Sequence, residues 1–220
     1  MKAIFCDFYG TVAYENGPIS FEVIKRVFKS SDAKSPEAVI EYWWETFRKR
    51  IDTACGDNWQ PQDTLALENF KELLAHFHSD ENPLELCDMM NRHWSNPPIY
   101  DDAKPFMENS PLPIYFVTNS DNKFILDAIE NHNLKPAGCI TSEQAKYSKP
   151  RVEIFKYALE KTGLLPNEVI HIGDSISSDI KCPATLGIKA VWLNRDGAPV
   201  PDGITAVINL DEALNIIKRQ

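Results

Sequence analysis

The sequence lacks the features of a zinc site, a disulfide framework or a membrane span. Its five cysteines are an odd number in 220 residues, widely scattered and without a Cys-x-x-Cys pair, which is typical of reduced thiols in a cytoplasm. No apolar run approaches the roughly 20 residues needed to cross a bilayer. The N-terminus reaches a charge at Asp7, too soon for the apolar region of a signal peptide. These absences predict a cytoplasmic protein that holds neither zinc nor disulfides.

Basic residues are also scarce. The chain has 23 Lys and Arg against 32 Asp and Glu, a formal net charge of -9. Nucleic acids and anionic membranes require a basic face, so the charge excludes both as the main partner. A small anionic substrate remains compatible with it, because such a substrate responds to the local field of its pocket. Internal repeats and low-complexity tracts are absent as well.

Short, continuous apolar runs predict a parallel β-sheet, because strands with helices on both sides need no polar face. Helical stretches alternate with these runs, which indicates βαβ units and an α/β fold with a Rossmann-like sheet. The expected strands are 3–6, 114–117, 139–141, 169–172, 189–193 and 206–208, and the expected helices are 122–131, 152–162, 178–186 and 210–218.

The segment from 15 to 97 has a different pattern. It carries no comparable strand, and its apolar residues recur at helical spacing. Turn or linker residues mark its entrance, at Asn16-Gly17-Pro18, and its exit, at Asn96-Pro97-Pro98. The sequence therefore predicts a Rossmann-like core of residues 1–14 and 98–220, an inserted all-helical domain of residues 15–97, and an active site between them. The two apolar stripes of the insert are Ile40, Trp43, Trp44 and Phe47, and Leu67, Phe70, Leu73, Leu74 and Phe77.

Residues that can carry chemistry follow the ends of three predicted strands, where sites lie in open parallel sheets. Asp7-Phe8-Tyr9-Gly10-Thr11 follows the first strand, Thr118-Asn119 ends the second, and the segment 173–179, Gly-Asp-Ser-Ile-Ser-Ser-Asp, ends the third. Lys149-Pro150 opens the helix between the last two. An Asp beside a Gly-Thr turn is by itself turn chemistry. All four elements in this order, however, resemble the haloacid dehalogenase superfamily over about 1–14 and 98–220, and the insert is similar to the helical cap of many members.

The resemblance implies a hydrolase with Asp7 as its nucleophile and with Mg²⁺ as its cofactor. The carboxylates of Asp7 and Asp174 and the backbone carbonyl of Tyr9 would bind the ion, and oxygen ligands of this kind suit Mg²⁺. A carboxylate that attacks a phosphoryl group approaches a negative charge, so a cation and fixed positive groups are required. The implied substrate is a small phosphorylated metabolite.

The other motif residues acquire roles from the same resemblance. Lys149 would neutralise the nucleophile and the phosphoryl oxygens. The Thr118 hydroxyl and the Asn119 backbone would bind a further phosphoryl oxygen. Asp179 would orient Lys149 or complete the metal shell.

Tyr9 departs from the phosphatase pattern, in which a second Asp protonates the leaving group and then activates water. The loss of a general acid–base costs about 10²–10⁴ in rate, and a phenol with a pKa near ~10 is a poor base. Asp-x-Tyr-Gly-Thr is the arrangement of the 2-haloacid dehalogenases, whose halide leaves without a proton. Those enzymes use no metal and carry Ser-Ser-Asn at the last motif, where this chain has Gly173-Asp174.

Two alternatives therefore stand beside the magnesium-dependent phosphohydrolase. The first is a metal-independent 2-haloacid dehalogenase with an ester intermediate on Asp7. Against it, Asp174 facing Asp7 without a cation would be repelled, and no arginine opens the first long helix of the insert to hold a halide, although Arg48 and Arg50 lie farther along. The second is a protein that binds a phosphorylated ligand with little turnover.

The remaining conspicuous residues are assigned to packing. His171 lies inside a predicted strand and is interpreted as a core residue. Trp43 and Trp44 are interpreted as the core of the insert. Strand alternation turns Cys6 away from the side of Asp7, which makes it a buried small hydrophobe.

Overall fold

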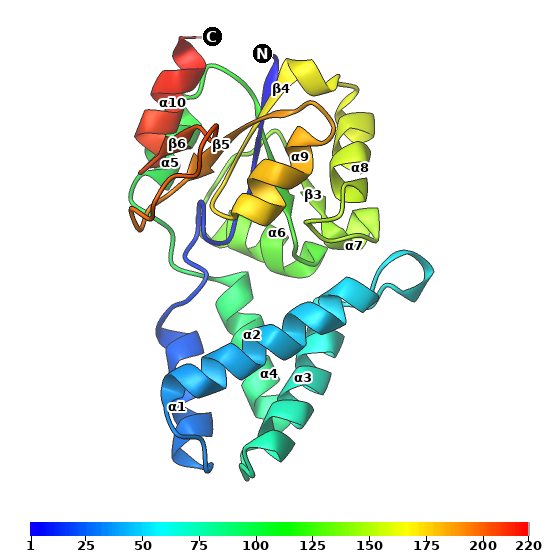
Figure 1. Cartoon of the computed structure of the whole chain (residues 1–220), viewed down its shortest axis with the longest axis vertical. Helices are drawn as coiled ribbons and strands as arrows, with labels where there is room; N and C mark the ends of the chain where they lie inside the picture. Colours follow the sequence, from blue (N-terminus) through cyan, green and yellow to red (C-terminus); the bar gives the residue numbers. More distant parts are fainter. Residues whose placement is uncertain (220) are drawn as a thin grey trace. The chain divides into compact units, whose positions relative to one another are not determined.

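The structure is a computed structural model and describes residues 1–219. Strands and helices alternate over most of the chain (Figure 1). The six strands are β1 (Ala3–Cys6), β2 (Ile114–Thr118), β3 (Gly138–Thr141), β4 (Val169–Gly173), β5 (Lys189–Leu193) and β6 (Ala206–Val207). The helices are α1 (Pro18–Lys29), α2 (Pro36–Thr53), η1 (Gly56–Asn58), α3 (Gln62–His76), α4 (Pro83–Ser95), α5 (Ala103–Asn109), α6 (Asn122–Asn131), α7 (Ser142–Ala145), α8 (Glu153–Thr162), η2 (Pro166–Glu168), η3 (Ile176–Lys181), α9 (Cys182–Ala184) and α10 (Leu210–Lys218).

The six strands form one parallel sheet in the order β3-β2-β1-β4-β5-β6. This confirms the predicted α/β fold class. The chain builds outward from β1 to β3 and then crosses back to place β4 on the other side of β1. Such a reversal of strand order leaves a crevice at the carboxyl ends of the two central strands, where ligands bind in sheets of this kind. Asp7 and Asp174 are the residues that follow β1 and β4.

Helices cover both faces of the sheet, with α8 and α9 on one side and α5 and α10 on the other (Figure 1). Every residue of β1 and of β4 is buried, which is why their sequences are apolar without alternation. On the α8 side, Phe5 packs in a cluster with Phe155 and Ala158. The central strands are thereby fixed on both faces, and their carboxyl ends form a rigid base for the residues that follow.

The chain divides into two compact units. The sheet unit contains Met1–Glu15, Pro98–Asn119 and the chain from His132 onward, and the helical unit contains Asn16–Pro97 and Ser120–Asn131. The second range differs from the predicted boundaries, because α6 groups with the inserted helices. The side chain of Ser95, at the end of α4, donates to Asp127 of α6 at 2.9 Å, and Trp94 and Phe124 form an edge-to-face pair with ring centroids 5.3 Å apart.

The helical unit has its own aromatic core, in which Trp43 of α2 packs against Phe70 of α3 with ring centroids 4.3 Å apart. Ser35 caps α2 by accepting from the Ala38 N–H, and Pro36 follows at the first helical position, as expected at a helix start. The buried face of α2 includes Val39 where the sequence predicted Ile40. Four residues of the predicted stripes are only partly buried: Ile40, Trp44, Leu67 and Phe77. The buried face of each helix is therefore shifted by about one residue from the predicted stripe at its edges.

Two predictions on the local structure of the sheet unit need correction. The predicted helix at 178–186 is helical but is not one α-helix: it consists of a π-helix, η3, and the short α9. Pro183 lies in the first turn of α9, where its missing N–H is tolerated. Lys149-Pro150 does not open a helix, since α8 begins only at Glu153. A residue before proline is disfavoured in the helical region, so Lys149 lies in the preceding turn.

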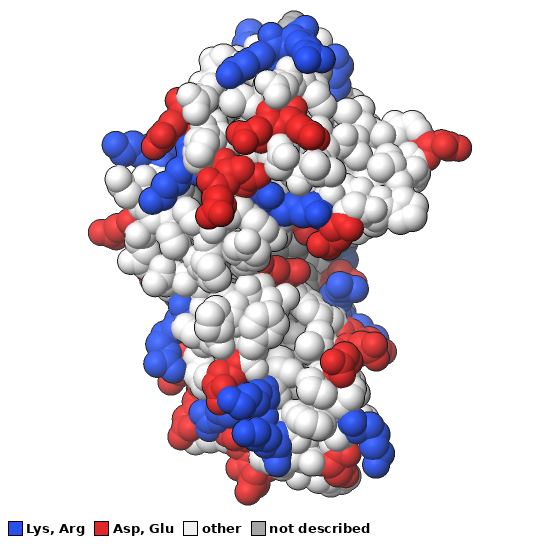
Figure 2. All heavy atoms as spheres, turned by 90° about the vertical axis from the view of Figure 1, so that its left-hand side faces the viewer, with Lys and Arg blue, Asp and Glu red and all other residues white. Residues whose placement is uncertain are grey.

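Charges of both signs are mixed on the molecular face shown in Figure 2. The helices carry exposed intrahelical pairs, such as Glu45 with Lys49 at 2.7 Å and Glu68 with Lys71 at 2.7 Å. Surface pairs of this kind keep a helix solvated and contribute little to stability. None of the helices within residues 1–219 is both long and apolar enough to span a membrane.

Candidate active site

A buried ion-pair cluster lies beyond the carboxyl ends of β1 and β4. The Lys149 ammonium donates to Asp7 Oδ1 at 2.5 Å and to Asp179 Oδ1 at 2.6 Å. All three side chains are less than a tenth exposed. A lysine is almost never fully buried unless it is paired, and here one ammonium connects a carboxylate of the loop after β1 with one of η3.

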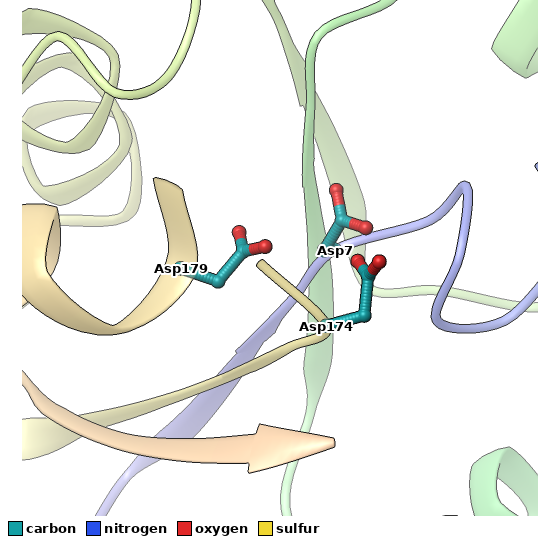
Figure 3. A group of neighbouring side chains, drawn as sticks. All are labelled: Asp7, Asp174 and Asp179. Atoms are coloured by element: carbon teal, nitrogen blue, oxygen red, sulfur yellow. The ribbon is translucent and has the colours of Figure 1, made fainter. Parts of the chain in front are cut away.

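Asp174 brings a third carboxylate to the same place. Asp7, Asp174 and Asp179 each offer an oxygen, and these oxygens lie within 4.8 Å of one another. The carboxyl groups of Asp7 and Asp174 lie next to each other, while Asp179 approaches from the side of η3 (Figure 3). This separation allows one cation to contact more than one of the three carboxylates, and oxygen donors are the ligands that Mg²⁺ requires.

The loop after β1 fits closely around Asp174. A Cβ at Gly10 would lie 2.5 Å from Asp174 Oδ2, and the φ angle of Gly10 is +88°, so the close approach and the backbone both require glycine here. The buried Thr11 hydroxyl donates to Asp174 Oδ1 at 3.4 Å. The Gly-Thr pair of the motif therefore shapes the space in which the Asp174 carboxylate lies.

Asp179 is fully engaged by protein groups. Its Oδ1 contacts the Lys149 ammonium and lies 2.9 Å from Nε2 of His171, and its Oδ2 accepts from the Ser175 N–H at 3.1 Å. A Cβ at Gly173 would lie 2.3 Å from Asp179 Cγ, so this glycine admits the carboxylate. These contacts make Asp179 the anchor of Lys149.

His171 is a polar neighbour of this cluster that the sequence analysis assigned to packing alone. It is completely buried, and its ring meets Phe155 edge-on, with centroids 4.9 Å apart. It is also a polar partner of Asp179. The available signal was a lone histidine in an otherwise apolar strand, eight residues before Asp179.

Burial and mutual repulsion govern the ionisation of the cluster. Burial raises the pKa of Asp174 to about 8, and the charges of Asp7 and Asp179 add to this shift. Burial likewise raises the pKa of Asp7, against the lowering effect of Lys149. For Asp179, Lys149 and the hydrogen bond to His171 outweigh burial and lower the pKa to about 2. Burial opposes the charge of Lys149, but Asp179 and Asp7 keep its pKa above the usual value.

The predicted residues at the end of β2 are placed beside this cluster through the backbone of Lys149. Asn119 Nδ2 donates to the Lys149 carbonyl at 2.8 Å, and Asn119 Oδ1 accepts from the Lys149 N–H at 2.6 Å. This reciprocal pair fixes the turn that carries the ammonium, a role that the sequence analysis did not assign to the side chain. Thr118 is buried at the end of β2. Tyr9 is partly buried, and its ring lies edge-on to Phe8 with centroids 4.9 Å apart.

Two residues at the end of β5 also contact the site, and the sequence analysis assigned a role to neither: Trp192 lies in the strand and Arg195 two residues beyond it. Trp192 Nε1 donates to the Asp174 carbonyl at 2.7 Å, and Arg195 donates to the Thr11 carbonyl at 2.9 Å. Motif reasoning could not find them, because this strand carries no motif.

Replacing Lys149 with methionine is expected to destabilise the fold by about 3–5 kcal/mol at neutral pH, the usual cost of removing one partner of a buried ion pair. The change would leave Asp7 and Asp179 buried without their shared cation. Urea unfolding of the metal-free protein measures the effect. Lys123→Met is the matched control, because Lys123 forms a half-exposed pair with Asp63 and should cost less than about 1 kcal/mol. Equal losses in the two variants would contradict the prediction.

Comparison with known proteins assigns the family. A model of the haloacid dehalogenase-like hydrolases matches residues 1–187. A phosphorylated carbohydrates phosphatase of Thermotoga maritima is 23% identical over 228 residues, which cover 99% of each chain. Two further relatives match over short segments. They are the haloacid dehalogenase-like hydrolase domain-containing protein 3 of Danio rerio, 41% identical over 56 residues, and the glyceraldehyde 3-phosphate phosphatase of Methanocaldococcus jannaschii, 42% identical over 52 residues. The chain spans 23% of the length of each.

Solved structures agree on the fold. An L-2-haloacid dehalogenase superposes with a TM-score of 0.82 at 14% identity, over 99% of both chains. The putative HAD-hydrolase YfnB of Bacillus subtilis, bound to magnesium, gives 0.79 at 18% identity, over 99% of this chain and 98% of that one. The relatives thus include both phosphatases and dehalogenases. The match over residues 1–187, with the strand order and the buried cluster described above, shows that this chain belongs to the haloacid dehalogenase-like hydrolase family.

Proposed function

We propose that the protein is a magnesium-dependent phosphohydrolase that acts on a small phosphorylated metabolite through a covalent intermediate on Asp7. The observation that carries the proposal is the position of Asp174. Its carboxylate lies beside that of Asp7 in a largely buried place, and burial and the negative neighbours raise its pKa to about 8. Ionisation of both carboxylates in such a place is unfavourable at neutral pH, and a bound divalent cation would favour it.

The residues present fit Mg²⁺. The ion would be held by Asp7, Asp174 and the backbone carbonyl of Tyr9, with water completing the shell. Because Asp179 already accepts from Lys149 and Ser175 and contacts His171, we assign it to holding Lys149 and not to the metal. Bound Mg²⁺ would polarise a phosphoryl oxygen and neutralise charge that develops on it.

The residues of the chain would then carry the covalent steps. An oxygen of Asp7 attacks phosphorus, the bond from phosphorus to the ester oxygen breaks, and the alkoxide leaves. Water next attacks the phosphorus of the acyl phosphate, which releases inorganic phosphate and restores the Asp7 carboxylate. Lys149, 2.5 Å from Asp7, would hold the nucleophile in place and offset the charge of the phosphoryl group, and Thr118 and the Asn119 backbone would bind its oxygens.

Tyr9 favours one competing function, a metal-independent 2-haloacid dehalogenase. An L-2-haloacid dehalogenase is among the structures that share the fold, and a halide needs no proton to leave. In that reaction an oxygen of Asp7 would displace halide from carbon, and water would hydrolyse the resulting ester. The position of Asp174 beside Asp7 favours the phosphatase, since a dehalogenase gains nothing from a second carboxylate next to its nucleophile.

We also place the enzyme in the cytoplasm, because all five cysteines are free, as is usual for reduced thiols in that compartment.

A single activity panel tests the proposal. The protein is stripped of metal with EDTA and assayed with and without Mg²⁺ on p-nitrophenyl phosphate, acetyl phosphate, a hexose phosphate and 2-chloropropionate. We expect Mg²⁺-dependent phosphate release from at least the first two substrates and no chloride release. Asp7→Asn, purified in the same way, is the control for contaminating phosphatases and should be inactive.

Two results would overturn the proposal in different ways. Chloride release that persists in EDTA would establish the dehalogenase. Tight binding of phosphate esters, without hydrolysis of any of them, would establish a binding protein with little turnover.

A further inference from the structure

We propose that Trp192, in β5, and Arg195, just after it, are positioning residues that hold Asp174 and the loop after β1 against each other. This inference rests on the proposed function, because it assigns the two residues to the geometry of the magnesium site. No motif of the sequence covers them, and neither is expected to contact substrate. They act through Asp174 and Thr11.

Trp192 fixes the backbone at Asp174. The indole N–H donates to the Asp174 carbonyl at 2.7 Å, and Trp192 pairs with Gly173 in the register of β4 and β5. The side chain is buried, and a buried indole N–H needs a hydrogen-bond partner. Asp174 comes directly after β4, so this bond determines how the chain leaves the strand and where its carboxylate starts.

Arg195 fixes the opposite side of the site. One of its terminal nitrogens donates to the Thr11 carbonyl at 2.9 Å, and the Thr11 hydroxyl donates in turn to Asp174 Oδ1 at 3.4 Å. The guanidinium is also bound by both oxygens of Asp102, at 2.9 and 3.0 Å. A bidentate pair of this kind fixes the plane of the guanidinium as well as its position.

Aromatic rings cover the guanidinium. The Tyr100 ring centroid lies 3.7 Å from Arg195 Cζ, and the Tyr14 ring packs against that of Tyr100, tilted by 30°, with centroids 3.8 Å apart. Tyr100 donates its backbone N–H to the Val12 carbonyl at 3.0 Å, so the stack is tied to the loop that the arginine holds. Only 15% of the Arg195 side chain is exposed, and contacts in such a place are worth more than those of a surface pair.

One donor of Arg195 is left unpaired in the described part of the chain. Its Nε is buried without a hydrogen-bond partner among residues 1–219. A buried donor left unsatisfied costs free energy, and an unpaired group of this kind calls for an explanation. The contact to Thr11 supplies one, because the guanidinium is turned so that its terminal nitrogens reach both Asp102 and the loop.

A structural role would explain part of the same contacts, since Asp102 also accepts from the Leu210 N–H at 2.9 Å and so anchors α10. The two roles differ in what they predict. A structural anchor affects the free energy of unfolding, whereas a positioning residue also affects metal affinity in protein that remains folded.

The test measures Mn²⁺ binding to the substrate-free enzyme by electron paramagnetic resonance, because Mn²⁺ is a spectroscopic substitute for Mg²⁺. Arg195→Met and Trp192→Phe should each raise the Kd for Mn²⁺ by about 10–100-fold, the usual effect of losing a group that orients a metal ligand. Arg195→Lys should lie between wild type and Arg195→Met, because one ammonium cannot reproduce the planar fork. We expect kcat to fall by a similar factor, with a smaller change in KM.

Arg26→Met is the matched control, because Arg26 also binds carboxylates, those of Glu81 and Glu85, but lies in the helical unit. It should lower stability without changing the Kd for Mn²⁺. If Arg195→Met does not fold, Trp192→Phe decides, since it keeps an aromatic side chain and removes the N–H donor. Wild-type affinity in folded Arg195→Met or Trp192→Phe would overturn the inference. A wild-type enzyme that binds no Mn²⁺ would instead contradict the proposed function.

Discussion

Asp174→Asn is expected to abolish both metal binding and phosphatase activity, and at the same time to stabilise the metal-free protein at pH 7 to 8. The first effect follows from the loss of a charged ligand. The second follows because Asp174 ionises at a cost in the folded protein, where burial and the charges of Asp7 and Asp179 raise its pKa from the usual 3.8 to about 8. Removal of the carboxylate removes that cost.

The sign of the pH dependence can be worked out from this shift. Between pH 4 and 8, the folded metal-free protein retains a proton on Asp174 that the unfolded chain has lost. The folded state therefore binds more protons, and the free energy of unfolding falls as the pH rises, by at most about 1.4 kcal/mol per pH unit. The stabilising contribution is complete below pH 4 and is lost as the pH passes through about 8. The raised pKa of Asp7 has the same sign.

His171 limits the range in which this slope can be seen. Burial lowers the pKa of His171 below the usual 6.5. Its contribution to the free energy of unfolding therefore increases with pH and is complete just above pH 6.5. Lys149 and Cys6 have raised pKa values, from usual values of 10.5 and 9.0, and so titrate at higher pH. The range from pH 6.5 to 8 therefore reports mainly on Asp174 and Asp7.

Urea unfolding in EDTA at several pH values between 6.5 and 8 measures the effect. The free energy of unfolding of the wild type should fall across this range. That of Asp174→Asn should depend less on pH and should not change when Mg²⁺ is added. Asp202→Asn, in an exposed turn, controls for the loss of one negative charge. A variant that follows the wild-type curve, or that still responds to Mg²⁺, would contradict the assignment of Asp174 to the metal.

The elements that could be predicted from the sequence are those defined by local patterns. The limits of β1, β5, α6 and α10 were predicted as they stand, because continuous apolar runs and helix boundaries are local. Asp7 and Asp174 were placed together for a topological reason, since carboxyl ends of parallel strands share one edge. The roles of these residues remain predictions.

What could not be predicted depends on contacts between distant segments. The pairing of His171 with Asp179 requires the π-helical η3 to turn its carboxylate back toward β4, and no local pattern indicates a π-helix. The contact of Arg195 with Thr11 joins residues 184 positions apart. Packing, and not the spacing of apolar residues along the sequence, determines which face of α2 is buried. Val39 is therefore buried where Ile40 was expected.

Tyr9→Asp is expected to raise the turnover of alkyl phosphates by up to about 10²–10⁴, the usual contribution of a general acid–base. The wild type lacks a carboxyl group at this position, two residues after the nucleophile. Its deficit should therefore depend on the leaving group. Aryl and acyl phosphates leave as weakly basic anions and need little protonation, whereas a sugar alkoxide needs nearly all of it.

The comparison of leaving groups makes this prediction specific. Wild-type activity should be measurable on p-nitrophenyl and acetyl phosphate and poor on hexose phosphates. Tyr9→Asp should raise the kcat for the hexose phosphates and change the other two far less. A general increase over all substrates would point to a wider opening of the site and not to a new acid.

Packing around Tyr9 sets the control for the same experiment. Its ring lies edge-on to Phe8, so the smaller aspartate removes an aromatic contact and leaves a cavity, and folding has to be checked by thermal unfolding. Tyr9→Phe keeps the ring and removes only the hydroxyl, and it should behave as the wild type. The contrary outcome is rapid hydrolysis of alkyl phosphates by the wild type, with slower hydrolysis by both Tyr9→Phe and a well-folded Tyr9→Asp. In that case the tyrosine hydroxyl already serves as the acid, and the proposed deficit does not exist.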